Sequence, residues 1–136
     1  MNTMKTIAVR LHPGQDLKIE LDSLAKQHDM EAACVITCVG SLTRAVLRYA
    51  DLDLVTLKGP FEIVSLTGTL SKHGSHYHIA ISDSNGSTYG GHLKEGSKIH
   101  TTAEIVLGIL PGSRFVRVAD DETGCNELDI KNISSY

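Results

Sequence analysis

The chain has 136 residues, of which 41% are hydrophobic and 21% are charged, and its formal net charge is −3. This length fits one domain whose core needs no disulfide. The acidic balance argues against a strong non-specific phosphate binder, because that function needs a clustered positive field. Aromatic residues are scarce at 4% and tryptophan is absent, so we expect an aliphatic core.

The sequence shows neither a signal peptide nor a membrane-spanning segment. The start, MNTMKTIAVRL, lacks the apolar stretch of a signal peptide, and no apolar run approaches the length of a membrane span. On one strand, Cys34 and Cys38 would lie about four rises of ~3.3 Å apart, which is too far for a disulfide. We therefore expect buried reduced thiols and a cytoplasmic protein that does not associate with membranes.

The first elements in chain order are a strand and a helix. Residues 5–11 are rich in β-branched and apolar side chains, and His12-Pro13-Gly14 then signals a turn. Asp16 is placed to cap a helix, and His28 falls near its C-terminal end, where a partly protonated imidazole suits the helix dipole. The apolar face of this amphipathic helix has i, i+4, i+7 spacing and consists of Leu17, Leu21 and Leu24.

Most of the remaining chain has β character. Residues 32–39, AACVITCV, form a continuous apolar run that predicts a strand covered on both faces. Gly40-Ser41 is expected to end it. Residues 42–51 then alternate, which places Leu42, Arg44 and Arg48 on one face of a new strand.

The C-terminal half continues this pattern. Gly59-Pro60 is expected to open a strand over 61–71, in which Phe61, Ile63 and Ser65 alternate with Glu62, Val64 and Leu66. Strands are also predicted over 99–110 and 114–119, whereas the tail, 120–136, is polar and weakly patterned. We predict a single domain over 1–136, of the α+β class, with a mostly antiparallel sheet and one main amphipathic helix near the N-terminus.

The segment from Ser75 to His92 permits two hairpin registers. A two-residue turn at Asn85-Gly86 would pair Ile79 with His92 and mix apolar with polar side chains on each face. A three-residue loop, with Gly86 in the left-handed position, pairs His78 with His92 instead and leaves the other face apolar. Because facing residues share an environment, we predict the second register.

This register gathers three imidazoles on one side of the hairpin. His76 lies on the same strand face as His78, roughly 6.6 Å along the strand. Zn²⁺ accepts neutral imidazole nitrogens, and three histidines with an open fourth position form a catalytic type of site. The alternative is that the histidines line a solvated or subunit-facing surface and bind nothing. His12, His73 and His100 have no such partner and are expected at the surface.

Five segments resemble the plant-and-prokaryote conserved (PPC) domain, which follows AT-hooks in plant nuclear proteins and stands alone in many bacteria and archaea. They are RLHPGQDL (10–17), GSLTRAVLR (40–48), GPFEIVSLTGTL (59–70), HYHIAISDSNGSTYGGHL (76–93) and TTAEIVLG (101–108). The resemblance implies an α+β fold, a homotrimer, a DNA-binding or transcription-associated role, and zinc at His76, His78 and His92. It also implies protein contacts through Gly59, Pro60, Phe61, Glu62, Ile63 and Val64.

The sequence departs from the plant proteins because it contains no Arg-Gly-Arg core of an AT-hook. The element that reads A·T-rich minor grooves is missing, so DNA binding by this chain is expected to be weak. One hypothesis is therefore a homotrimeric assembly module that regulates through contacts with itself and other proteins. The other is a zinc-dependent enzyme or small-anion-binding protein, with Glu104 as catalytic candidate and Arg10, Arg44 and Arg48 as anion-binding candidates.

Overall fold

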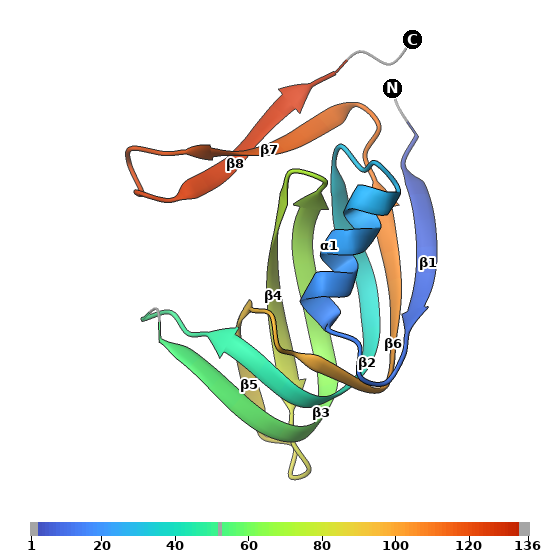
Figure 1. Ribbon diagram of the computed structural model, residues 1–136, viewed down its shortest axis with the longest axis vertical. Coiled ribbons are helices and arrows are strands. Elements are labelled where there is room, and N and C mark those ends of the chain that lie inside the picture. The colour runs from blue at the N-terminus through green and yellow to red at the C-terminus, as the bar shows by residue number, and fades with distance from the viewer. Residues whose placement is uncertain (1–2, 52, 134–136) are drawn as a thin grey trace.

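The computed structural model describes residues 3–51 and 53–133, which form one helix and eight strands (Figure 1). In chain order these elements are β1 (Lys5–Leu11), α1 (Leu17–Gln27), β2 (Ala33–Arg48), β3 (Leu54–Ser71), β4 (Gly74–Ser82), β5 (Thr88–Leu93), β6 (Lys98–Ile109), β7 (Ser113–Ala119) and β8 (Asn126–Asn132).

Six of the strands form one antiparallel sheet in the order β1-β6-β2-β3-β4-β5. The end of β2 also pairs with β5, through Leu47 with Leu93 and Arg48 with His92. Strands β2 to β5 therefore close into a ring, while β7 and β8 form a separate two-stranded hairpin that projects from the body of the molecule (Figure 1). The antiparallel α+β class predicted from the sequence is confirmed.

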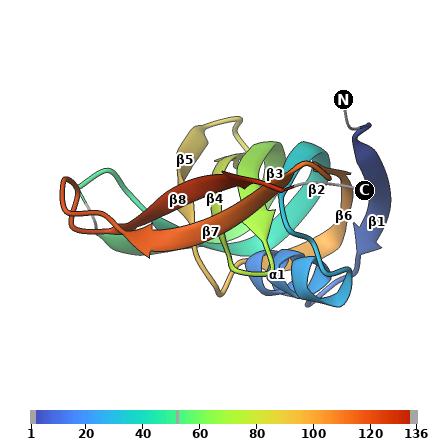
Figure 2. The same cartoon turned by 90° about the horizontal axis from the view of Figure 1, so that it is seen from above.

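Helix α1 lies against one face of the sheet (Figure 2). The Asp16 side chain accepts a hydrogen bond from the backbone N–H of Ile19 at 3.1 Å, which satisfies a donor of the first turn. His28 is the C-terminal cap, as its position in the sequence suggested. The helix buries Leu17, Leu21 and Ala25 completely against the strands.

The opposite face of the sheet carries no helix within residues 3–51 and 53–133, and apolar side chains remain exposed there. Ile36 is 47% exposed and Val39 is 54% exposed. The prediction that 32–39 is covered on both faces is therefore wrong for a single chain. The reason is that this fold has only one helical layer, so only one face of β2 is buried.

Strand β2 continues through the residues expected to break it. Gly40 has a φ of 156°, and a Cβ there would collide with the carbonyl of Thr102 on the neighbouring β6. The glycine thus permits close approach of two strands and does not end one. A β-bulge between Leu42 and Arg44 then reverses the alternation, so that Leu42 is fully buried while Arg44 is exposed.

A second bulge changes the alternation in β3. This strand starts at Leu54, runs through Gly59-Pro60, and is irregular between Ile63 and Ser65. Leu66 therefore joins Ile63 in the core, and Ser65 faces outward. The tail also differs from the expectation, because β8 lies within the weakly patterned residues. Its backbone pairs with β7, and most of its side chains stay exposed.

The three cysteines are free thiols: Cys38 is buried, Cys34 is half-buried and Cys125 is exposed. The bulge between Val35 and Thr37 separates the faces on which the first two lie. In the part of the chain that the structure describes, α1 is too short and too polar to span a membrane.

Candidate metal site

The hairpin of β4 and β5 adopts the register predicted from the sequence. The backbone N–H of Asp83 donates to the Ser87 carbonyl at 2.9 Å, and Gly86 has a left-handed φ of 81°. His78 lies directly opposite His92. The face turned to the core carries the four side chains expected there, Tyr77, Ile79, Ile81 and Leu93, each at most 3% exposed.

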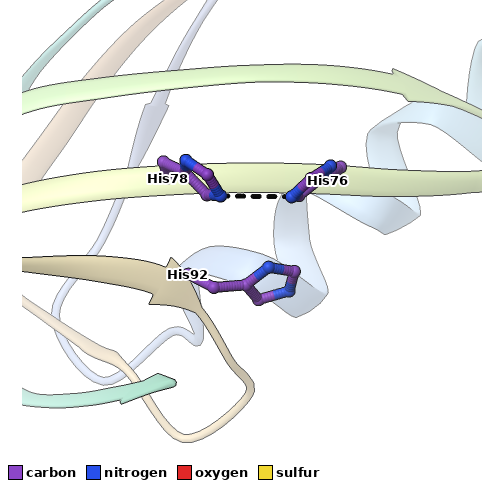
Figure 3. Close-up of side chains that lie close together, drawn as sticks. All are labelled: His76, His78 and His92. Atoms are coloured by element: carbon purple, nitrogen blue, oxygen red, sulfur yellow. Dashed lines mark hydrogen bonds between the residues drawn. The ribbon is translucent and has the colours of Figure 1, made fainter. Parts of the chain in front are cut away.

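The three histidines gather on the outer face of this hairpin (Figure 3). The Nε2 atoms of His76 and His78 are 3.1 Å apart, and His92 reaches toward both rings from β5. One ligand nitrogen from each ring lies within 4.8 Å of the others. His76 and His78 are exposed, and His92 is half-buried, so the cluster is open to solvent on one side.

This donor set fits a tetrahedral metal ion. Zinc–nitrogen bonds of 2.0–2.1 Å imply ligand nitrogens about 3.3 Å apart, close to the 3.1 Å between His76 and His78. The nitrogens of the three rings lie within 4.8 Å of one another, so the rings would draw closer together around an ion. Imidazole donors suit zinc and also copper, nickel and iron, so the residues indicate a borderline metal and leave a fourth position open.

The surroundings of His76 and His92 favour the neutral imidazole. Burial, and then the positive charge of Arg48, lowers the pKa of His92 to about 4. Burial and the neighbouring His78 likewise lower the pKa of His76. Because a metal binds the neutral ring, these shifts leave His76 and His92 in the form that coordinates an ion at neutral pH.

Two open clefts adjoin the cluster, and His78 lines both. The first has a volume of about 310 Å³ and is bounded by Thr67, Thr69 and His76. The second, of about 290 Å³, lies between Arg48, Tyr49 and His92, beside two glycines of β5. These volumes lie near the lower end for small-molecule sites.

The other predicted site residues are distributed over the sheet. Glu104 lies on β6 opposite Arg10 of β1, and β2 and β3 separate β6 from the strand that carries His76 and His78. The Arg44 guanidinium donates to the carbonyl of Gly96 at 3.0 Å. Of the predicted catalytic and anion-binding residues, the structure brings only Arg48 to the histidines, with its Nη2 3.4 Å from Nδ1 of His92.

The segment expected to contact other proteins alternates between the core and the surface. Phe61 and Ile63 are 5% and 6% exposed and belong to the core. Pro60, Glu62 and Val64 are exposed, and Gly59 is half-buried between the strands. Only the outward-facing members are available to a partner.

Sequence reasoning missed Arg117, which comes to the site from the β7–β8 hairpin. Its Nη2 donates to Oγ1 of Thr69 at 3.3 Å, and Thr69 is the cross-strand partner of His76. The charge of Arg117 also lowers the pKa of His76, whereas Glu127 of the same hairpin raises it. The alternation of residues 114–119 predicts a strand, but it does not indicate which part of the sheet that strand contacts.

A family model, the Plants and Prokaryotes Conserved (PCC) domain, matches residues 1–111. A curated relative, the bifunctional protein GlmU of a Synechococcus strain, is 45% identical over 133 residues. That match covers 97% of this chain and 21% of the relative, so the chain spans about a fifth of the length of the curated protein.

Solved structures share the fold. A hypothetical protein from Salmonella enterica is 40% identical, with a TM-score of 0.93 and coverage of 97% of this chain and 96% of that one. A protein from Archaeoglobus fulgidus, described as metal-containing, is 28% identical, with a TM-score of 0.77 and coverage of 91% and 92%. A candidate DNA-binding protein from Ralstonia eutropha, 22% identical with a TM-score of 0.80 and coverage of 91% and 90%, shows the fold alone.

Proposed function

The chain belongs to the Plants and Prokaryotes Conserved domain family, and on that premise we propose that it is a metal-dependent protein that holds zinc on His76, His78 and His92. The observation that carries the proposal is the convergence of three imidazole nitrogens within 4.8 Å. The description of the Archaeoglobus fulgidus relative as metal-containing supports it.

Each part of the site has a role in this proposal. The histidines bind as neutral ligands, which agrees with the lowered pKa of His76 and His92. A bound zinc ion supplies Lewis acidity and lowers the pKa of a water molecule toward neutrality. The two clefts beside His78 admit a small ligand to the fourth position. The function is therefore that of a zinc-dependent enzyme or a zinc-dependent binder of small ligands.

Metal analysis tests the proposal directly. The protein is purified without a histidine tag, stripped with a chelator, reloaded with zinc in excess and desalted. We expect about one zinc per chain, as three imidazole ligands give on a single site. Reloading with cobalt, nickel or copper in competition identifies the preferred ion. If the desalted protein retains no metal from any of these solutions, the proposal is wrong.

We also propose that the chain assembles as a homotrimer through the helix-free face of the sheet. Ile36 and Val39 of β2 are 47% and 54% exposed, and Val64 of β3 is 57% exposed. Apolar side chains on two adjacent strands support burial against another copy. Val64 also lies within the segment expected to make protein contacts.

A DNA-associated regulatory role is the second candidate function. The observation in its favour is the shared fold with the Ralstonia eutropha protein that is named as a candidate DNA binder. The charge does not favour it, because 16 acidic residues outnumber 13 basic ones and DNA affinity depends on neutralised phosphates. We rank this role below metal binding for that reason.

A further inference from the structure

We propose that the site binds a small oxyanion, a carboxylate or phosphate group, between the metal ion and the guanidinium groups of Arg48 and Arg117. This inference rests on the proposed metal function and names the class of ligand. It assigns a role to the β7–β8 hairpin, which lies beyond the residues matched by the family model.

The ring of strands places Arg48 beside the histidines. Arg48 of β2 is the cross-strand partner of His92 on β5, and His92 is the partner of His78 on β4. Direct cross-strand partners have Cβ atoms about 5 Å apart. Arg48, His92 and His78 therefore form one row across three strands, with the guanidinium at its end.

Metal binding would release Arg48 from its present contact. A guanidinium only donates hydrogen bonds, so the contact at 3.4 Å requires an unprotonated Nδ1 on His92. If the metal binds Nδ1, it occupies the lone pair to which Arg48 now donates. If it binds Nε2, the neutral ring carries its proton on Nδ1 and cannot accept there. In either case the Arg48 guanidinium loses its acceptor on His92 while it lies next to the metal.

Arg117 approaches from the other side of the cluster. Its hydrogen bond to Thr69 places the guanidinium beside the cleft that His76 and His78 line. The arm of Arg117 passes close to Gly74 of β4, since a Cβ there would lie 3.0 Å from Cγ of Arg117 and the arm would have to shift slightly. The side chain of Arg117 thus lies over the start of β4, the strand that carries His76 and His78.

Neither Arg48 nor Arg117 forms an ion pair with a carboxylate in the part of the chain that the structure describes. Among residues 3–51 and 53–133, no carboxylate lies within 4.0 Å of the basic nitrogens of Arg48 or Arg117. The negative charge of Glu127 raises the pKa of His76, whereas the positive charge of Lys94 lowers the pKa of His92. With a divalent ion bound, the surroundings are strongly cationic, and a guanidinium fork matches the paired oxygens of carboxylate or phosphate.

The cobalt-substituted protein provides the test, because the visible spectrum of Co²⁺ reports a change of its fourth ligand without any assay of activity. Inorganic phosphate and acetate are titrated separately into the wild-type protein and into Arg48→Gln, Arg117→Gln and Arg117→Lys. Arg10→Gln is the matched control, because Arg10 is on β1, at the other edge of the sheet from β5.

We expect at least one of the two anions to change the cobalt spectrum with saturation. Arg48→Gln and Arg117→Gln should keep the metal and weaken the anion about tenfold each, the effect of losing one charge-assisted hydrogen bond. Arg117→Lys should weaken it less, and Arg10→Gln should not change it.

The failures are distinguishable. If cobalt binds but neither anion changes the spectrum, or if both glutamine variants bind anions as the wild type does, the oxyanion inference is wrong and the metal function stands. If neither cobalt nor zinc binds, the oxyanion inference and the proposed metal function are both wrong.

Discussion

The hydroxyl of Tyr77 donates a hydrogen bond to Oδ1 of Asp22 at 2.9 Å, which ties β4 to helix α1. Tyr77 is fully buried and stands between His76 and His78 in the chain, so the two histidines point to the opposite face. Burial, together with the charge of Asp22, raises the pKa of Tyr77 far above its usual range. The phenol therefore stays protonated and keeps donating, which holds the core face of β4 against α1 while the histidines lie on the other face.

Replacing this phenol tests its contribution to stability. Tyr77→Phe removes a partly buried hydrogen bond to a carboxylate, so the free energy of unfolding should fall by about 1–3 kcal/mol. Urea denaturation measures it. Tyr89→Phe is the control, because Tyr89 is 38% exposed and its hydroxyl lies 3.4 Å from Asp83. Equal stabilities of Tyr77→Phe and the wild type would contradict the assigned role.

Single histidine substitutions should abolish stoichiometric metal. His78→Ala and His92→Ala each remove one of three ligands, so zinc retained after desalting should fall from about one per chain to a small fraction. His100→Ala is the control, since His100 is exposed on β6 and outside the cluster. Elemental analysis gives the result. Full retention of zinc in both cluster variants would place the metal elsewhere.

Stability at acidic pH should depend on Glu31. Its hydrogen bonds with Lys72 and Arg114, at 2.8 and 2.6 Å, lower the pKa of its carboxyl from 4.5 to about 2. Because the folded state holds the charged form, the stabilisation is complete above pH 4.5 and is lost as the pH falls toward 2.

The comparison with Glu31→Gln measures this contribution. The variant should have a lower denaturant midpoint than the wild type at pH 7, and the difference should shrink steadily between pH 4.5 and pH 2. Glu95→Gln serves as control, because Glu95 is exposed and forms no ion pair among the residues that the structure describes. A difference that stays constant over this range would show that the ion pairs do not control it.

Assembly should depend on the helix-free face. Val39→Asp would place a charge where we propose that copies meet, so the variant should have a smaller mass than the proposed wild-type trimer, with an unchanged fold. Light scattering after size exclusion gives the mass, and circular dichroism gives the fold. Ile19→Asp is the matched control, because Ile19 is 43% exposed but lies on α1, on the other side of the sheet. A monomeric wild-type protein would refute the proposal.

Binding of A·T-rich DNA by this chain should be weak or absent at physiological ionic strength. The net charge is −3, and no Arg-Gly-Arg core occurs in the sequence, so few phosphates can be neutralised. Fluorescence anisotropy with a labelled duplex, repeated over a range of salt concentrations, measures the affinity. Nanomolar affinity would reverse our ranking of the two candidate functions.

The local parts of the site could be predicted from the sequence. Asn85-Gly86 specifies a turn, and the demand that facing residues share an environment selects the pairing of His78 with His92. The helix was predictable for the same kind of reason, because Asp16 and the leucine spacing act within a few residues of each other.

The bulges and the long-range contacts could not be predicted in this way. A one-residue bulge, such as that between Leu42 and Arg44, reverses the faces of a strand yet leaves no mark in the hydrophobic pattern. Arg48 and His92 are 44 positions apart, and Arg117 reaches Thr69 across 48. These long-range contacts depend on how strands β2 to β5 close into a ring and on where the β7–β8 hairpin lies. Both are properties of the whole fold.

The hairpin of β7 and β8 is attached to the body through a short connection after β6. The imidazole donors reside in the sheet, whereas Arg117 resides in this appendage. On the proposal made above, a substitution of Arg117 changes the anion that is bound while the three imidazoles, which lie in the sheet, keep their positions. The proposal therefore separates the two tasks in the chain, with the metal ligands on β4 and β5 and part of the anion contact on β7.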